Sequence, residues 1–510
     1  ETGEGWGMVR VANAETRWDR KTLPLLEQNS TALASLQRTR ASVAFKSDIW
    51  VVGDTGTANQ ARAATYVGST TTWTITTNNP AGFAALVGAQ DIVEYLGSVV
   101  VGVWTNAPVL SSTSATGKTG AWSAVTNLAG LTINVPAANS DNDYLRFAIV
   151  RGELVAAAWD ETSGQITFNS KTAAGGAWVD EAINIASGNG PQGVGIMTDS
   201  AGNEFLWVST REGLWEVDTS PATWTARLRV PMTPHNDNGR WMTVWNGVLY
   251  VGVGVDNNQA AGMLSVSYQS GAGRPIDVVK GLGLSSKEGI PAEMLGPITR
   301  MKAVADLGIF YALGGGAASR NARIMFYDPF NNAHHSVYRH GTANRKIWWI
   351  EISSDDDGTT RLHYAVRTGA ATEQISFLEQ PLASPTSGAT LRYEPSGSLE
   401  YPEIRLHPNQ NGSILQALLD ATGTSADETV ALLTDVNGVS PPTTAIGTFT
   451  NTTISLSYGS GVGTAGRTFN VGYNLARVAG TNTNTPQVRR LEVAITKNLR
   501  DLRRYQLVVD

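Results

Sequence analysis

A strand-like run of apolar and aromatic residues recurs along the first three quarters of the chain, and this repeat constrains the fold more than any other feature. Such a repeat with a period of about 50 residues is typical of the four-stranded blades of a β-propeller. A single blade has an apolar face that needs a neighbour to cover it, whereas a closed ring covers every face. The repeat therefore predicts a seven-bladed β-propeller. The seven copies are Asp48–Val52, Ser98–Trp104, Glu153–Trp159, Glu204–Val208, Gly247–Val253, Gly308–Leu313 and Arg361–Val366.

The segments that flank each run predict the remaining strands of a blade. In the fifth copy, the apolar segment Arg240–Trp245 precedes the run and is expected to be the first strand. The sixth copy predicts all four strands, at Ile298–Val304, Gly308–Leu313, Arg323–Tyr327 and His335–Tyr338. We expect the propeller to cover residues 36–382.

Residues 1–35 precede the repeat and are expected to be an N-terminal arm or a ring-closing segment. They contain a helical pattern, Leu23–Leu36, which Pro24 interrupts near its start. A docking helix is one interpretation of this pattern. The other is a strand or arm that closes the ring or packs beneath it, and the residues alone leave both open.

The last quarter of the chain has a different pattern. A passage rich in Pro, Ser and Gly predicts a linker at residues 383–397. Beyond it, short strand-like segments separated by Gly and Asn turns predict a jelly-roll-like β-sandwich at residues 398–510. One short helix is expected at Ile414–Ala421. The expected strands are Glu403–Leu406, Glu428–Leu433, Thr453–Tyr458, Thr468–Leu475, Arg490–Ile495 and Arg504–Val509.

The composition agrees with an all-β chain and argues against several functions. Charged residues are only 16% of the chain, while 53 Gly and 15 Trp suit short strands joined by tight turns. The absence of Cys excludes disulfides, thiolate metal sites and cysteine nucleophiles. A net charge of −6 without a basic stripe argues against a nucleic-acid partner. No apolar run approaches the roughly 18 residues of a membrane span, so we expect no membrane insertion.

The last quarter of the chain contains a succession of short motifs, in the order Ser398–Pro402, Leu432–Val436, Ile446–Phe449, Gly466–Phe469, Asn484–Pro486 with Arg489, and Arg503–Leu507. This succession resembles a module that is common in structural proteins of tailed bacteriophages, where it commonly follows a propeller-like repeat region. The resemblance implies a non-enzymatic virion structural protein that is associated with the tail and located in the virion. Its partners would be other virion proteins and symmetry copies of itself, with a host-surface glycan as a candidate ligand.

Three turn-like segments carry a second, weaker resemblance. Ser114–Trp122, Ser170–Trp178 and the shorter Ser69–Trp73 are similar to the Asp-box turn of sialidase-like propellers, although each lacks the Asp. In that family the box is a structural turn away from the active site. It keeps open an alternative function, a sialidase-like glycoside hydrolase on a propeller with a sugar-binding sandwich. A secreted bacterial adhesin is a further alternative.

The sequence contains no strong catalytic or metal-binding motif, so we predict that the protein is not an enzyme and needs no cofactor or metal. His334 and His335 are adjacent on an expected strand, where consecutive side chains point to opposite faces and cannot share one metal. The acidic run Asp355–Gly358 could bind Ca²⁺ through carboxylate oxygens, but a hairpin turn explains it more simply.

The most useful candidates for ligand binding are charged residues that follow the second strand of a blade. Arg211, Arg320 and Arg367 occupy comparable positions in the fourth, sixth and seventh copies, and Asp54 and Asp256 do so in the first and fifth. In a propeller these turns gather around one end of the axial channel. We therefore predict a site there for an anionic glycan or for an acidic loop of a partner. Sialidases hold their substrate carboxylate with three arginines, so the same residues also fit the enzymatic alternative.

Overall fold

The computed structural model of the chain is built almost entirely from β-strands. The residues it describes are 10–12, 14–16, 22–24, 29–33, 38–45, 48–54, 61–67, 72–75, 89–103, 109–112, 123–125, 144–160, 162–171, 177–188, 190–254, 262–271, 273–280, 296–305, 307–314, 321–330, 332–343, 345–354, 360–367, 373–380, 396–401, 403–406, 411–438, 442–477 and 486–497.

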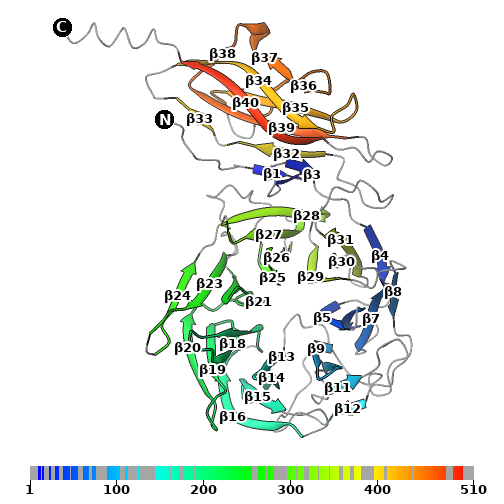
Figure 1. The fold of residues 1–510 in the computed structure, drawn as a ribbon, viewed down its shortest axis with the longest axis vertical. Coiled ribbons are helices and arrows are strands. Elements are labelled where there is room, and N and C mark those ends of the chain that lie inside the picture. Colours follow the sequence, from blue (N-terminus) through cyan, green and yellow to red (C-terminus); the bar gives the residue numbers. More distant parts are fainter. Residues whose placement is uncertain are drawn as a thin grey trace, which may run out of the picture.

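Seven four-stranded antiparallel sheets in the described residues are arranged in a ring (Figure 1). The first strand of each sheet contacts the first strand of the next sheet around the ring. The first strand of the seventh sheet contacts that of the first sheet, so the circle is closed. The all-β fold class and the propeller fold predicted from the repeat are confirmed. The sheets, each listed in its hydrogen-bonded order, are β5 (Arg38–Phe45), β6 (Asp48–Asp54), β7 (Ala61–Val67) and β8 (Thr72–Ile75); β9 (Ala89–Tyr95), β10 (Ser98–Val103), β11 (Val109–Ser112) and β12 (Ser123–Val125); β13 (Leu145–Val150), β14 (Glu153–Asp160), β15 (Gln165–Lys171) and β16 (Val179–Ala186); β17 (Gly193–Thr198), β18 (Glu204–Thr210), β19 (Gly213–Asp218) and β20 (Thr225–Pro231); β21 (Met242–Trp245), β22 (Val248–Val253), β23 (Gly262–Tyr268) and β24 (Ile276–Lys280); β25 (Ile298–Val304), β26 (Gly308–Leu313), β27 (Asn321–Asp328) and β28 (Ala333–Ala343); and β29 (Lys346–Ser354), β30 (Thr360–Arg367), β31 (Glu373–Gln380) and β4 (Asn29–Leu33).

The second strand of each sheet explains the repeated apolar runs. These strands lie between neighbouring sheets, so both of their faces are covered; every residue of β26 is buried. Between the sixth and seventh sheets, Phe310 and Ile324 pack in one cluster with Ile350 and Leu362. The sheets approach closely enough that a Cβ on Gly252 would lie 2.9 Å from the Cβ of Ile298 in the next sheet. The second strand of a blade therefore requires a continuous apolar run and not a strictly alternating one.

The ring is closed by a strand from the N-terminal region. β4 pairs antiparallel with β31, from Leu33 opposite Glu373 to Asn29 opposite Phe377. The described residues within Leu23–Leu36 belong to strands, so a docking helix there is wrong, and β4 is the part of this segment that closes the ring. The free edge of β31 offers hydrogen-bond partners that outweigh the weak helical spacing of this segment.

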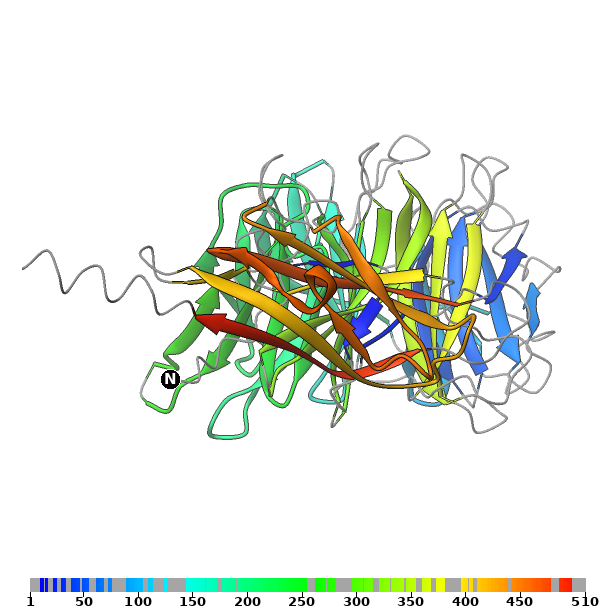
Figure 2. The same cartoon turned by 90° about the horizontal axis from the view of Figure 1, so that it is seen from above.

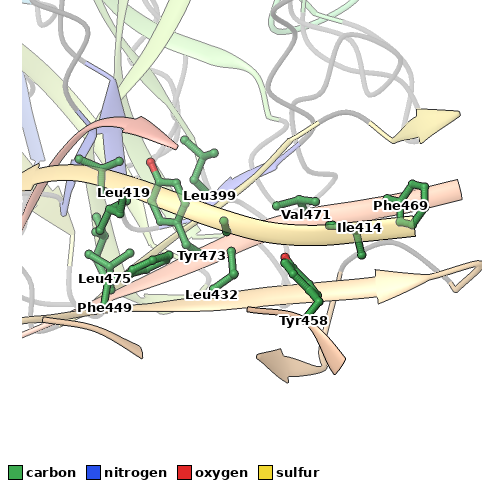
Figure 3. Packing of buried hydrophobic residues seen from close by; sticks show 13 residues of the cluster. Leu399, Ile414, Leu419, Leu432, Phe449, Tyr458, Phe469, Val471, Tyr473 and Leu475 are labelled. Carbon is green, nitrogen blue, oxygen red and sulfur yellow. The ribbon is translucent and has the colours of Figure 1, made fainter. Parts of the chain in front are cut away.

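Two further sheets, each with six strands, lie beside the ring near β28 (Figures 1 and 2). They share one hydrophobic core, to which Leu399, Leu432 and Tyr473 contribute from the first sheet and Ile414 and Leu419 from the second (Figure 3). The first sheet contains β1 (Arg10–Ala12), β32 (Ser396–Glu400), β39 (Thr468–Ala476), β35 (Thr429–Val436), β36 (Ala445–Phe449) and β33 (Ile404–Arg405); the second contains β2 (Ala14–Thr16), β3 (Thr22–Pro24), β40 (Gln487–Lys497), β34 (Gly412–Thr422), β37 (Ser455–Ser457) and β38 (Thr464–Gly466).

The helix expected at Ile414–Ala421 is wrong, because these residues belong to strand β34. The segment is rich in Leu and Ala, which favour helices. In the structure, however, β40 and β37 pair with its two edges, and Ile414, Ala417 and Leu419 reach the shared core. Pairing on both sides and burial of one face override the local helical preference. The strand expected at Arg504–Val509 lies outside the described residues.

The expected division of the chain differs from the structure in its first 35 residues. β1, β2 and β3 join the two six-stranded sheets, whereas β4 joins the propeller. Most of the expected linker at residues 383–397 lies outside the described residues, and β32 begins within it at Ser396. Among the described residues, no helix has the length and apolar character that a membrane crossing requires.

Candidate functional site at one end of the axial channel

The two ends of the propeller differ in the length of their connections. In each blade, the first strand begins on the side of the ring where the second strand finishes. We call this side the loop-rich end. β12, β24 and β8 end there, and 19, 17 and 13 residues, respectively, separate them in the sequence from the first strand of the next sheet. At the opposite end, several first and second strands are joined by two-residue turns such as Leu96-Gly97. Long connections on a rigid scaffold are where binding residues concentrate.

An aromatic ring inside the loop-rich end of the channel carries two guanidinium groups. Trp241 directly precedes β21, and its ring centroid lies 4.8 Å from the Cζ of Arg146 and 4.5 Å from the Cζ of Arg300. Arg146 comes from the third sheet and Arg300 from the sixth. Both distances lie within the range of cation–π attraction. The ring and the two cations thus connect three different blades.

The same arginines bond to the backbone of other inner strands. Arg146 Nη1 donates to the carbonyl oxygen of Gln90 at 3.1 Å. Arg300 Nη2 donates to the carbonyl oxygen of Arg40 at 2.9 Å. Arg40, Gln90, Arg146 and Arg300 are all buried. With Trp241 they form what we call the channel cluster, which ties the first, second, third, fifth and sixth sheets together.

A line of polar contacts connects the channel cluster to the outer surface. Arg240 lies next to Trp241 and forms an ion pair with Asp237 at 3.2 Å. The side chain of Asn238 donates from Nδ2 to the carbonyl oxygen of Arg211 at 2.7 Å. Arg211 keeps 34% of its side chain exposed and lies 3.3 Å from Glu212 Oε1. The contacts therefore link the rim to the channel, with Arg240 paired to Asp237 and Arg211 paired to Glu212.

The structure describes only part of the predicted ligand-binding set. Arg211 lies in the turn after β18, at the rim of the loop-rich end. Asp54 and Arg367 are the last residues of β6 and β30, which places their backbone at the same end, while their side chains are outside the described residues. Arg320 and Asp256 lie outside them altogether.

The sequence analysis missed the arginines of the channel. Arg40, Arg146, Arg240 and Arg300 each stand at or just before the apolar part of a first strand. An arginine in this position recurs in four of the seven repeats, and that recurrence was the available signal. The predicted site residues all come from the turns after the second strands, which do not contain these arginines.

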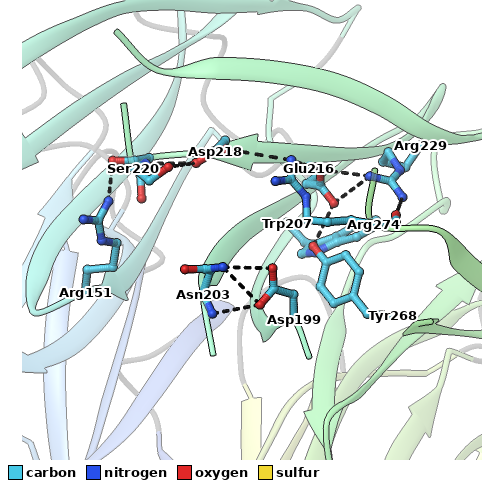
Figure 4. Close-up of polar contacts among 11 residues, drawn as sticks. Arg151, Asp199, Asn203, Trp207, Glu216, Asp218, Ser220, Arg229, Tyr268 and Arg274 are labelled. Carbon is cyan, nitrogen blue, oxygen red and sulfur yellow. Dashed lines mark hydrogen bonds and ion pairs between the residues drawn. The ribbon is translucent and has the colours of Figure 1, made fainter. Parts of the chain in front are cut away.

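A second polar cluster lies between the fourth and fifth sheets, away from the channel (Figure 4). Glu216 accepts hydrogen bonds from Arg229 Nη1 at 3.0 and 2.9 Å, from Arg274 Nη2 at 3.2 Å and from the Tyr268 hydroxyl at 2.7 Å. Trp207 Nε1 donates to the Tyr268 oxygen at 3.0 Å. These contacts satisfy both carboxylate oxygens of a residue that is almost fully buried.

This Tyr–Glu pair is unsuited to act as a sialidase-type nucleophile. Burial, together with the hydrogen bond to Glu216, raises the pKa of Tyr268 far above its ordinary value. A nucleophilic phenol needs the opposite shift, because the phenolate is the attacking species. Tyr268 instead donates its proton to Glu216. The cluster therefore holds two blades together and offers no activated nucleophile.

His334 of the histidine pair has aromatic neighbours in the structure. The Nδ1 atom of His334 lies 2.9 Å from the Tyr311 hydroxyl, and its ring stacks on Tyr327 at 4.7 Å. Within the part of the chain that the structure describes, no group of three or more His, Asp or Glu side chains could hold a metal ion. The acidic run Asp355–Gly358 is outside the described residues, and its role stays a prediction.

Comparisons with known proteins give structural likeness only. No family model and no curated protein matches the chain. YCF48 from Cyanidioschyzon merolae is 11% identical with a TM-score of 0.42, over 69% of this chain and 98% of that one. The polysaccharide lyase Uly1 is 11% identical with a TM-score of 0.39, over 68% of this chain and 90% of that one. An exo-β-1,3-galactanase from Phanerochaete chrysosporium is 12% identical with a TM-score of 0.29, over 79% and 95%. At this level of similarity, none of them indicates a ligand or an activity for this chain.

Proposed function

We propose that this protein is a non-catalytic binding protein that recognises an acidic glycan at the loop-rich end of its propeller. The observation that carries the proposal is the gathering of Arg146 and Arg300 around Trp241 below the rim, where Arg211 keeps 34% of its side chain exposed. Guanidinium groups bind carboxylates and sulfates through charge-assisted, often bidentate hydrogen bonds.

Charge and shape favour a sugar over a nucleic acid as the anionic ligand. The whole chain carries a net charge of −6, so a long polyanion would be repelled away from the channel. A localised site at the rim, where Arg211 is partly exposed, can bind an acidic group of a glycan without accommodating a long polyanion. The resemblance of the last quarter to phage structural proteins would place this binding on a virion, with other virion proteins and copies of the chain as partners.

The test is a binding measurement with the full chain and a set of neutral, carboxylated and sulfated polysaccharides. We expect binding to acidic members only, weakening as salt rises from about 50 to about 200 mM, because exposed charges are screened. Arg211→Ala should lower the affinity by roughly 10-fold, the value of one charge-assisted hydrogen bond. The control is Arg227→Ala, which removes the same charge from an exposed position on β20.

Two outcomes would contradict this function. Equal binding of neutral and acidic polysaccharides, or an equal loss of affinity in Arg227→Ala, would remove the channel end as the site. Release of reducing ends or of unsaturated sugars from a bound polysaccharide would contradict the non-catalytic role and favour the carbohydrate-active alternative. Antibody labelling of phage particles tests the virion location separately, because a failure to label them leaves glycan binding intact.

A further inference from the structure

The guanidinium group of Arg211 is held at one edge and open at the other. Its Nε atom is buried and lies 3.3 Å from Glu212 Oε1, whereas 34% of the side chain as a whole is exposed. Among the described residues, no hydrogen bond or ion pair involves Nη1 or Nη2 of Arg211. The two terminal amino groups are therefore left for a ligand.

The backbone around Arg211 is fixed by the connection that follows β20. The carbonyl oxygen of Arg211 accepts hydrogen bonds from His235 N at 3.2 Å and from Asn238 Nδ2 at 2.7 Å. The carbonyl oxygen of Glu212 accepts a further bond from Met232 N at 2.8 Å. A turn that is anchored in this way loses little conformational freedom when a ligand binds, and this favours affinity.

Glu212 orients the guanidinium group and limits the charge that it can bind. Its Oε1 atom lies beside Arg211 Nε, and its Oε2 atom accepts a hydrogen bond from Ser187 Oγ at 3.4 Å. The carboxylate is thus held on the Nε side and leaves the Nη1 and Nη2 side open. It also sets one negative charge beside the positive one, so a ligand group with a single charge is repelled less than a dense cluster of charges.

Gly188 leaves space beside the same guanidinium group. It lies in the connection between β16 and β17, and a Cβ at this position would be 3.5 Å from both Cδ and Nη1 of Arg211. The φ angle of Gly188 is not in the positive range that favours glycine, so the backbone conformation does not require this residue type. A side chain longer than that of Ala would cover Nη1, and the absence of a side chain keeps this edge accessible.

We propose that Nη1 and Nη2 of Arg211 together bind one carboxylate of the glycan, with Glu212 as a positioning residue and Gly188 as the residue that keeps the edge accessible. Two parallel N–H···O bonds from one guanidinium group match the two coplanar oxygens of a carboxylate. The ligand class is therefore a glycan with isolated carboxylates, as in uronic acids, and not a heavily sulfated one. This inference rests on the proposed function and adds to it the binding atoms and the class of acidic sugar.

The ligand class is tested by measuring the binding of the full chain to an oligouronate and to a heavily sulfated oligosaccharide of the same length. We expect the oligouronate to bind more tightly. Glu212→Gln removes the neighbouring negative charge and should raise the affinity for the sulfated ligand by roughly 2- to 5-fold. Tighter binding of the sulfated ligand by the unchanged protein would overturn the carboxylate class and leave the binding of acidic glycans intact. No gain in Glu212→Gln would overturn the role of Glu212.

The pair of amino groups is tested by Arg211→Lys. This variant keeps the charge but replaces the planar fork by a single ammonium group. It should lower the affinity for the oligouronate by roughly 5- to 10-fold, nearly as much as Arg211→Ala does. Wild-type affinity in Arg211→Lys with a loss in Arg211→Ala would overturn the paired binding and leave the proposed function standing. Wild-type affinity in both variants would remove the proposed function as well.

The space at Gly188 is tested by two side chains of different length. Gly188 is exposed, so Gly188→Leu and Gly188→Ala should both keep the wild-type midpoint of thermal unfolding. We expect Gly188→Leu to lower the affinity for the oligouronate about as much as Arg211→Lys does, because it covers Nη1, and the matched control Gly188→Ala to bind as the unchanged protein does. Wild-type affinity in Gly188→Leu, or an equal loss in the two variants, would overturn the role of the missing side chain.

Discussion

At the scale of single residues, the buried charges of this protein are explained by the partners that the fold brings to them. Glu216 is almost fully buried and receives Arg229, Arg274 and Tyr268 from three different segments. A carboxylate in such a position is costly unless every oxygen is satisfied. Its role is therefore to join the fourth and fifth blades.

Replacing this carboxylate tests that role. Glu216→Gln removes the charge that Arg229 and Arg274 neutralise, and we expect the free energy of unfolding to fall by about 3 kcal/mol or more. The control is Glu212→Gln, whose side chain is 35% exposed and whose ion pair with Arg211 should contribute below about 1 kcal/mol. Urea unfolding followed by Trp fluorescence measures both. A similar fall in the free energy of unfolding of the two variants would show that the burial of Glu216 does not account for the effect.

At the scale of elements, strand pairing determined the secondary structure of segments whose residue spacing fits either a helix or a strand. The segment around β4 and the segment of β34 both contain residues at helical spacing. Both are strands because neighbouring strands pair with them, β31 with β4 and both β40 and β37 with β34. Second strands such as β26 could be predicted well, since their burial between two sheets requires a continuous apolar run.

The closing strand β4 gives a prediction at this scale. The double variant Ser30→Pro with Thr31→Pro should open the ring and lower the free energy of unfolding by about 3 kcal/mol. Consecutive N–H groups of a strand point to opposite sides, so one of the two prolines removes a donor facing β31. The control, Ser30→Thr with Thr31→Val, keeps both donors and should be neutral. Unfolding followed by Trp fluorescence reports on the propeller, and an unchanged midpoint for the proline variant would contradict ring closure by β4.

At the scale of the whole molecule, the N-terminal region joins the two domains. β1, β2 and β3 extend the six-stranded sheets, and β4 a few residues later completes the last blade of the propeller. β2 also contacts β28 on the rim of the ring. The sandwich is thus held beside the ring by a segment that belongs to both.

Removal of residues 1–28 tests this connection. The truncated chain keeps β4 but loses three edge strands of the sandwich, so we expect the sandwich to unfold earlier while the propeller keeps its midpoint. Scanning calorimetry and circular dichroism would show a separate low-temperature transition, while the midpoint reported by the 13 remaining Trp, all within residues 50–349, would be unchanged. Parallel loss of both signals would show instead that the propeller depends on β1 to β3.

The sequence by itself determined the β-rich blades, because a repeated apolar run flanked by turns can bury both faces only between neighbouring sheets. It also predicted that the turns after the second strands, including that of Arg211, lie at one end of the channel, since second strands in equivalent repeats end at the same end of the ring. Only the tertiary structure decided that β4 closes the ring, that Ile414–Ala421 is a strand and that Arg146 and Arg300 meet at Trp241. These outcomes depend on contacts between residues tens to hundreds of positions apart, and local spacing carries no information about such partners.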